Sequence, residues 1–145
     1  MTAPTASPRL GATSVWLTVA IVALAVTAGL IHLSLGSLIF KLNARGYFVL
    51  TAGLVLFEVW KNPWVVRFRW APRVGLIGYA AASIVAWLIV GGFYTLGYVT
   101  KVIEVTLIAL LVIDLYRRYG GFGGLVHEGV GSLHDLGAAV AARIG

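Results

Sequence analysis

The chain has 145 residues, of which 60% are hydrophobic and 11% charged, whereas a soluble domain carries roughly a quarter of charged residues. This composition argues against a soluble globular or disordered protein, and the absence of cysteine excludes disulfides, Cys-ligated metals and thiol catalysis. The formal net charge of +6 is common in nucleic-acid-binding proteins, but here the basic residues lie between apolar blocks, so we expect no nucleic-acid partner.

Four apolar stretches approach or exceed the ~20 residues that a transmembrane helix needs. They cover about residues 15–40, 46–62, 74–94 and 96–118. Continuous apolar runs of this length are typical of helices and far exceed an ordinary strand. The sequence therefore predicts an all-α protein, with a four-helix transmembrane bundle over residues 15–119.

The first stretch has a second interpretation, as a cleaved signal peptide, because Ala23-Leu24-Ala25 fits a small-x-small cleavage site. The apolar run continues to Phe40, however, well past the end of a signal-peptide core. We favour a retained helix, preceded by a short cytoplasmic segment over residues 1–14.

Lysine and arginine are distributed unequally between the two sides of the predicted bundle. One side carries seven of them: Arg9, Lys61, Arg67, Arg69, Arg73, Arg117 and Arg118. The other side carries three, namely Lys41 and Arg45 in an expected tight loop, and Lys101. The excess predicts a multi-pass protein of the cell (inner, cytoplasmic) membrane with both termini in the cytoplasm.

The linker over residues 61–73 interleaves cations with aromatic side chains: Lys61, Trp64, Arg67, Arg69, Trp70 and Arg73. Pro63 and Pro72 are expected to stop the flanking helices. The favoured interpretation is an interfacial segment on anionic headgroups, where each cation contributes ~1 kcal/mol. The alternative is a docking site for a partner or a specific lipid.

Small residues on two helices predict how the bundle packs, because close approach drives helix association in lipid. One face of the first helix carries Thr18, Ala25, Gly29, His32 and Gly36, and one face of the third carries Gly75, Gly78, Ala82 and Ala86. These stripes predict a tight bundle with little internal space. Tyr47 is expected at the membrane–water interface, where amphipathic rings prefer to lie.

Residues 120–145 form a separate tail. A glycine-rich hinge over residues 120–124 ends the fourth helix, and an amphipathic interfacial helix follows. Its apolar face comprises Val126, Val130, Leu133, Leu136, Val140 and Ile144. Gly129, Gly131 and Gly137 weaken helix preference by ~1 kcal/mol each, so this helix needs a surface to lie on. That surface is either the membrane interface or another subunit.

The sequence contains no constellation typical of an enzyme or a metal site. It has no Ser-His-Asp arrangement, no P-loop and no GxGxxG after a strand. His127 and His134 would lie ~10.5 Å apart along a helix, too far to share one metal ion. His32 is the only histidine in a span, so a bis-His haem would need a partner's histidine. We expect no enzyme activity, no metal and no cofactor.

The candidate site is an intramembrane polar cluster of His32, Lys101 and Glu104. His32 lies ~13.5 Å below Lys41, and Glu104 ~15 Å below Tyr94, so their depths match. Since unpaired polar groups in hydrocarbon are costly, the two are predicted to meet. Alternatively, His32 bonds a backbone carbonyl and Glu104 pairs only with Lys101. Two other acids have simpler expected partners: Lys61 for Glu58, and Arg117 or Arg118 for Asp114.

One long stretch, GLIHLSLGSLIFKLNARGYFVLTAGLVLF from Gly29, is followed much later by LGYVTKVIEVTLIALLVIDLYRR. Together they resemble small four-span prokaryotic membrane proteins grouped as a domain of unknown function. The resemblance runs from about Val15 to Arg118 and leaves out the tail. It implies four helices and brings no catalytic or binding residue with it.

The function expected first is that of a non-enzymatic accessory or structural subunit in a larger membrane assembly. Its partners would be the lipid bilayer and other membrane subunits or further copies of the chain. Two alternatives stay open. One is a lipid-, quinone- or haem-binding module that uses His32, and the other is a small oligomeric transporter or proton conduit that uses Glu104.

Overall fold

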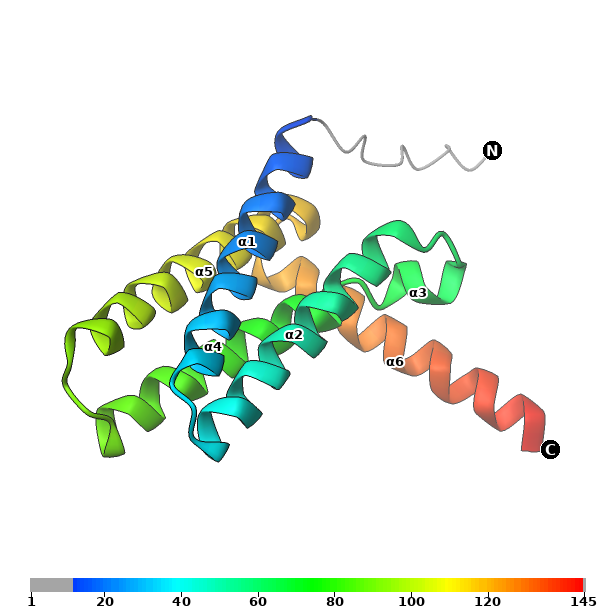
Figure 1. Ribbon diagram of the computed structural model, residues 1–145. Helices are drawn as coiled ribbons and strands as arrows, with labels where there is room; N and C mark the ends of the chain where they lie inside the picture. Colours follow the sequence, from blue (N-terminus) through cyan, green and yellow to red (C-terminus); the bar gives the residue numbers. More distant parts are fainter. Residues whose placement is uncertain (1–11, 145) are drawn as a thin grey trace.

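The computed structural model describes residues 12–144, so most of the predicted 1–14 segment, with Arg9, lies outside the described residues. The described chain folds into helices only: α1 (Ala12–Ser34), α2 (Leu38–Val59), α3 (Pro63–Arg67), α4 (Trp70–Val90), α5 (Thr95–Tyr119) and α6 (Phe122–Ile144) (Figure 1). Four of them, α1, α2, α4 and α5, are long and apolar enough to span a membrane. The predicted all-α, four-helix bundle is confirmed.

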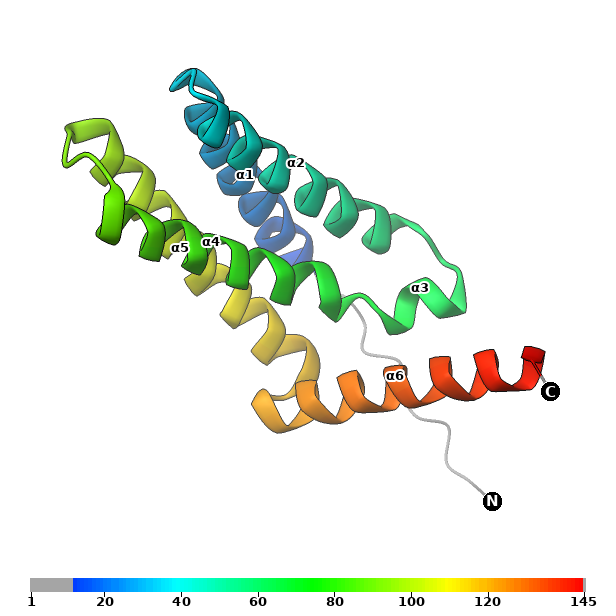
Figure 2. The same ribbon diagram turned by 90° about the horizontal axis from the view of Figure 1, so that it is seen from below.

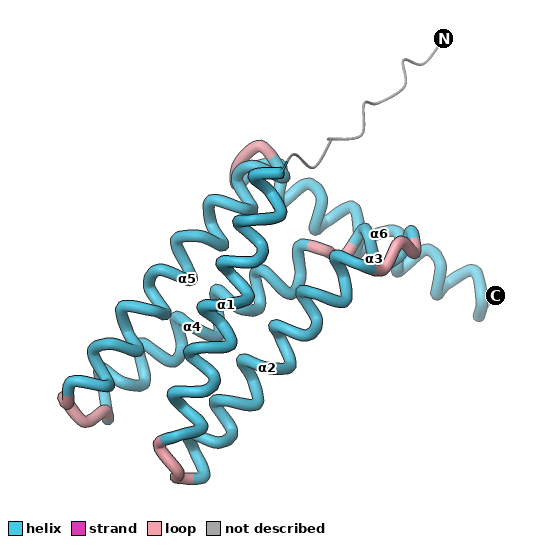
Figure 3. Tube along the Cα trace, turned by 45° about the horizontal axis from the view of Figure 1, so that its top comes forward, coloured by secondary structure: helices cyan, strands magenta, loops and turns pink. Residues whose placement is uncertain are grey.

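The four long helices form two antiparallel hairpins, α1–α2 and α4–α5, which pack side by side. α1 contacts α2 and α5, and α4 contacts α5 and α2, so the helices surround a common axis. The turns over residues 35–37 and 91–94 lie at the same end of the bundle (Figure 3). We call this the hairpin end, and the opposite end, near which α6 begins, the α6 end.

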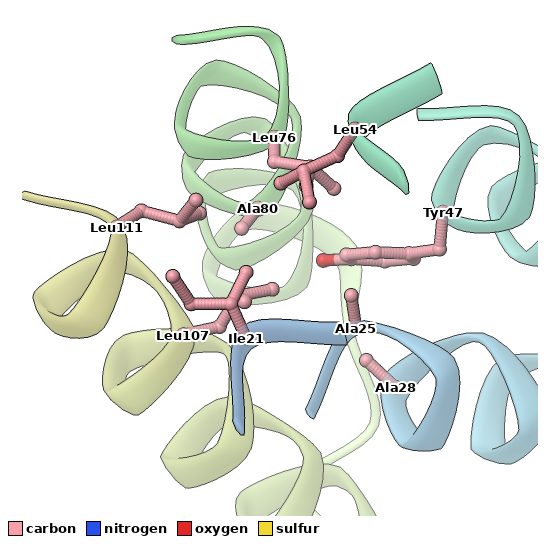
Figure 4. Packing of buried hydrophobic residues seen from close by; sticks show 9 residues of the cluster. All are labelled: Ile21, Ala25, Ala28, Tyr47, Leu54, Leu76, Ala80, Leu107 and Leu111. Carbon is pink, nitrogen blue, oxygen red and sulfur yellow. The ribbon is translucent and has the colours of Figure 1, made fainter. Parts of the chain in front are cut away.

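Residues facing the axis recur at spacings of three and four, as in left-handed helix bundles. On α5 the buried face reads Glu104, Leu107, Leu111 and Asp114. The other helices share this order, with polar side chains at both ends and an apolar middle. That middle contains Ile21, Ala25, Leu54, Leu76, Ala80, Leu107 and Leu111 (Figure 4).

The outer surface of the bundle is apolar along its length. Val49, Ile89 and Val102 each expose two thirds or more of their surface. An exposed apolar surface of this extent would be unfavourable in water and is typical of contact with lipid chains.

The turn between the first two helices differs from the expected loop at Lys41 and Arg45, which instead lie within α2. The chain reverses at residues 35–37, where Gly36 adopts a positive φ of 78°. Glycine has no Cβ to obstruct this left-handed conformation, whereas residues 41–45 carry no glycine. Gly36 therefore belongs to the turn and not to the small-residue face of α1.

The start of α4 also differs from the sequence prediction. Pro72 does not stop a helix but lies in the first turn of α4, which begins at Trp70. Proline is tolerated there because the first-turn N–H groups have no intrahelical acceptor. The linker is correspondingly shorter and contains the single-turn helix α3, in which the Asn62 side chain accepts a hydrogen bond from Trp64 N at 2.9 Å.

The tail forms the predicted amphipathic helix, which runs across the α6 end of the bundle (Figure 2). Gly120 and Gly121 make the bend, with positive φ values of 71° and 114°. Two polar contacts join this helix to Arg67: Ser132 Oγ donates to the Arg67 carbonyl at 3.2 Å, and Asp135 pairs with the Arg67 guanidinium. The six predicted apolar residues are all exposed.

Candidate functional site: a cavity with a buried polar end

The hairpin end contains a cavity of about 450 Å³ between the two hairpins. Its wall is mostly apolar and includes Leu35, Ile39, Phe40, Trp87, Val90 and Tyr94. This space contradicts the expected tight bundle with little internal volume. The small residues Ala82 and Ala86, which were expected to let a helix approach, line the cavity instead.

Glu104 of α5 lies behind the polar end of this cavity, where it bonds Ser83 and Lys101, two of the residues that line the cavity. The side chain is 0% exposed, and three groups donate hydrogen bonds to its carboxylate. Tyr47 Oη and Ser83 Oγ each donate to Oε1 at 2.8 Å, and Lys101 Nζ donates to Oε2. Three donors therefore converge on the Glu104 side chain, which forms an ion pair with Lys101.

His32 of α1 completes this group, which we call the cavity cluster: His32, Tyr47, Ser83, Lys101 and Glu104. His32 Nε2 lies 3.7 Å from Glu104 Oε1, so the predicted meeting of the two side chains is confirmed. The alternative contacts are also present, since His32 Nδ1 bonds the Ala28 carbonyl at 2.8 Å and Lys101 pairs with Glu104. A carbonyl oxygen can only accept, so Nδ1 carries a proton, and in the neutral form of the ring Nε2 is then an acceptor.

Sequence reasoning missed Tyr47 and Ser83. Tyr47, expected at the membrane–water interface, is 0% exposed and stacks on the His32 ring with centroids 5.6 Å apart. The signal was its spacing: Tyr47, Thr51, Leu54 and Glu58 recur at four and three residues and share one face of α2. A tyrosine on the axial face turns its hydroxyl towards other polar groups in the bundle.

A second polar group, the basal cluster, lies near the α6 end and comprises Thr18, Glu58, Arg73, Asp114 and Arg118. Arg73 is 0% exposed, and its Nε donates to Asp114 Oδ2 at 2.7 Å while its guanidinium also pairs with Glu58. Arg118 Nε donates to Asp114 Oδ2 at 2.9 Å, and Arg118 Nη1 lies 3.1 Å from Glu58. Two carboxylates and two guanidinium groups neutralise each other.

Arg73 therefore departs from its expected place in the interfacial basic loop. Because α4 begins before Pro72, Arg73 lies on the axial face of the first turn, level with Glu58 and Asp114. A buried charge needs such partners. Glu58 consequently pairs with Arg73 and Arg118 rather than with Lys61, and Asp114 pairs with Arg118 and Arg73 rather than with Arg117.

The other predicted loop residues divide into exposed and bonded ones. Lys61 and Trp64 are exposed. Arg69 Nε donates to the Phe57 carbonyl at 2.6 Å and Nη2 to the Glu58 carbonyl at 3.1 Å, which caps the end of α2. The Trp70 Nε1 group is buried without a hydrogen-bond partner among the described residues.

The chemistry that this arrangement supports is binding. Across the described residues, no three histidine, cysteine, aspartate or glutamate side chains gather as a metal site would require. The cavity instead offers an apolar volume with a polar end, which is the usual design of a small-molecule site.

Comparison with known proteins adds no family to this picture. No family model matches the chain, and no curated protein or solved structure shows significant similarity to it. The resemblance to four-span proteins of unknown function stays a prediction.

Proposed function

We propose that this protein is a non-enzymatic integral membrane protein that binds a small amphipathic molecule, such as a lipid or a quinone, in the cavity at the hairpin end. The observation that carries this proposal is the cavity itself, about 450 Å³ with a mostly apolar wall, in which His32, Ser83 and Lys101 of the cavity cluster supply polar groups. Small-molecule sites typically measure ~300–1,000 Å³ and combine apolar walls with a few convergent polar groups.

Among the ligands considered from the sequence, haem is the least supported. A bis-His haem needs two axial imidazoles, and His32 is the one histidine among the residues that line the cavity. A lipid or a quinone needs only hydrogen bonds and apolar contact, which the cavity offers.

A proton or solute conduit through Glu104 finds less support than binding. The apolar middle of the bundle, with Leu76, Leu107 and Leu111, separates the two polar clusters. Glu104 and Asp114 lie ten residues apart on α5, which corresponds to ~15 Å along the helix axis. The cavity opens on one side of this layer only.

A second candidate function is that of a subunit in a larger membrane assembly, as first expected from the sequence. The supporting observation is the uncovered apolar face of α6, where Val130 is 63% and Ile144 81% exposed. Deleting residues 125–145 should leave membrane insertion intact and reduce recovery of the complex. Unchanged recovery after the deletion would contradict this candidate.

We place the protein in the cytoplasmic membrane with both termini in the cytoplasm, on the excess of Lys and Arg at the α6 end. α1 begins and α5 ends at that end of the bundle, so one orientation applies to both termini. A reporter that works only in the cytoplasm should be active when it is fused to either terminus. Activity of a reporter that works only in the periplasm or outside the cell would overturn the assignment.

Filling the cavity tests the proposed function directly. Ala86→Phe places a ring in the cavity, whereas Ala109→Phe makes the same change on an exposed position of α5. Native mass spectrometry after mild extraction should show a bound lipid or quinone with the unmodified protein and the Ala109 variant, and none with the Ala86 variant. Equal ligand recovery from all three would contradict binding in the cavity.

A further inference from the structure

We infer that the ligand of the cavity is a neutral molecule that presents a hydroxyl group to His32 Nε2. This inference rests on the proposed function and names the chemistry of the ligand's polar end. Its basis is the count of hydrogen-bond donors and acceptors that the cavity cluster still has available.

The donors of the cavity cluster are already engaged. Lys101 Nζ has three hydrogens and three acceptors: Glu104 Oε2, the Ser83 carbonyl at 3.3 Å and Ser83 Oγ at 3.0 Å. The hydroxyls of Tyr47 and Ser83 both donate to Glu104 Oε1. A ligand with carbonyl or phosphate oxygens would have to displace one of these bonds.

The hydrogen-bonding capacity left over within the cavity cluster is that of an acceptor. His32 lines the cavity and is 4% exposed, and the proton on Nδ1 leaves Nε2 as a lone-pair acceptor. At 3.7 Å, Nε2 and Glu104 Oε1 are both acceptors and are too far apart for a hydrogen bond. Asn43 donates one hydrogen to Ser83 Oγ at 3.2 Å, so its side-chain oxygen and its second N–H hydrogen can both meet the hydroxyl of a ligand. A group that enters here is therefore favoured when it donates.

The net charge of the cavity cluster decides whether the donor group of the ligand is a hydroxyl or a cation. Lys101 and Glu104 cancel, and the neutral His32 adds nothing, so the cavity cluster has no net charge. A cationic head would enter an apolar cavity without a counter-ion, at a large desolvation cost. A hydroxyl donates a hydrogen bond without bringing a charge.

The wall indicates that the rest of the ligand is apolar. Phe40, Trp87 and Tyr94 contribute aromatic rings to the wall. Ile39 and Val90 also line the cavity, and they are 69% and 79% exposed on the outer surface of the protein. A phenol or quinol ring fits between aromatic side chains, and an alkyl or isoprenoid tail can leave past Ile39 and Val90 into the lipid.

Three matched probes separate these possibilities in nanodiscs that contain the complete chain. 4-Octylphenol supplies a hydroxyl, 4-octylfluorobenzene replaces it by a fluorine of similar size that cannot donate, and octyltrimethylammonium supplies a cation. We expect the phenol to bind about tenfold or more tightly than the fluorobenzene, since a buried acceptor is otherwise left unpaired, and the cation to bind weakest.

Nitrogen-15 NMR of labelled histidine reports the hydrogen bond itself. The phenol should shift the Nε2 resonance of His32 towards that of a hydrogen-bonded acceptor, and leave the exposed His127 and His134 unchanged. His32→Leu should reduce the preference for phenol over fluorobenzene to about onefold, with His134→Leu as the matched control. If His32→Leu does not fold, the NMR shift on the unmodified protein decides the question.

The outcomes distinguish the two proposals. Equal binding of phenol and fluorobenzene, or preference for the cation, would overturn the hydroxyl inference and leave the proposed function standing. If the Ala86→Phe variant binds the probes as tightly as the unmodified protein does, the proposed function is overturned, because the probes then bind outside the cavity. No binding of any probe would overturn both.

Discussion

The cavity cluster and the basal cluster are built from similar parts and differ in what surrounds them. Both contain a buried carboxylate on α5, Glu104 in one and Asp114 in the other, and both join residues from all four long helices. The basal cluster pairs two acids with two arginines. The cavity cluster pairs one acid with one lysine, and its histidine faces open volume.

This difference indicates that the basal cluster stabilises the fold, whereas the cavity cluster can bind a ligand. In the basal cluster each carboxylate contacts both guanidinium groups, and each such bond is charge-assisted. In the cavity cluster an acceptor on His32 stays unused beside about 450 Å³ of space. Satisfied networks hold helices together, whereas spare hydrogen-bonding capacity beside a cavity is typical of a ligand site.

The largest effect should follow from breaking the basal cluster. Arg73→Leu leaves Glu58 and Asp114 with Arg118 as their only remaining cation of the cluster, so the free energy of unfolding should fall by ~3–5 kcal/mol. Reversible unfolding in mixed micelles measures this loss. The matched control is Arg117→Leu, which replaces an exposed arginine next to Arg118 on α5 and should change stability little. Equal effects of the two substitutions would contradict a stabilising role for the basal cluster.

A smaller effect is expected in the cavity cluster. Glu104→Gln keeps one acceptor but removes the charge, which should cost ~1.5–3 kcal/mol because bonds to charged groups are lost. His32→Ala removes the stacked ring and the neighbour of Glu104, so the two losses should be non-additive by ~0.5 kcal/mol or more. A double-mutant cycle measures the coupling. Additive losses would show that the contact between the two side chains carries no energy.

Glycines on α2 sharpen the comparison further. A Cβ on Gly46 would overlap the Tyr79 hydroxyl, which donates to the Asn43 carbonyl at 3.1 Å beside the cavity. Gly46→Ala should therefore destabilise the bundle by ~1–3 kcal/mol. Gly53→Ala, two turns along the same helix, meets nothing within 4 Å and should be neutral or stabilising. Thermal unfolding of both variants checks this, and a neutral Gly46→Ala would contradict the packing of Tyr79.

The sequence predicts those features of the fold and the site that depend on short stretches of the chain, and it fails for those that depend on how the helices pack. Apolar length predicts the four helices, and the cost of unpaired polar groups in hydrocarbon predicts the contact of His32 with Glu104. The depth assigned to His32 was wrong, because it was measured from Lys41, which lies in α2. Arg73 was misplaced because it depends on where α4 begins, and a proline is compatible with both a helix stop and a first helical turn. Tyr47 was misplaced because an aromatic belt and a buried tyrosine look alike until the axial face is fixed. The cavity could not be predicted at all, since a stripe of small residues permits either close packing or open space.

The most direct test of the account is the accessibility of two alanines on α4. The chain has no native cysteine, so Ala86→Cys, which lines the cavity, and Ala80→Cys, which is 0% exposed in the apolar middle, each introduce a single thiol. A small water-soluble methanethiosulfonate should label Ala86→Cys and not Ala80→Cys in intact membranes, and 4-octylphenol should protect Ala86→Cys. Equal labelling at both positions, or no labelling at Ala86→Cys, would contradict a cavity that opens only at the hairpin end.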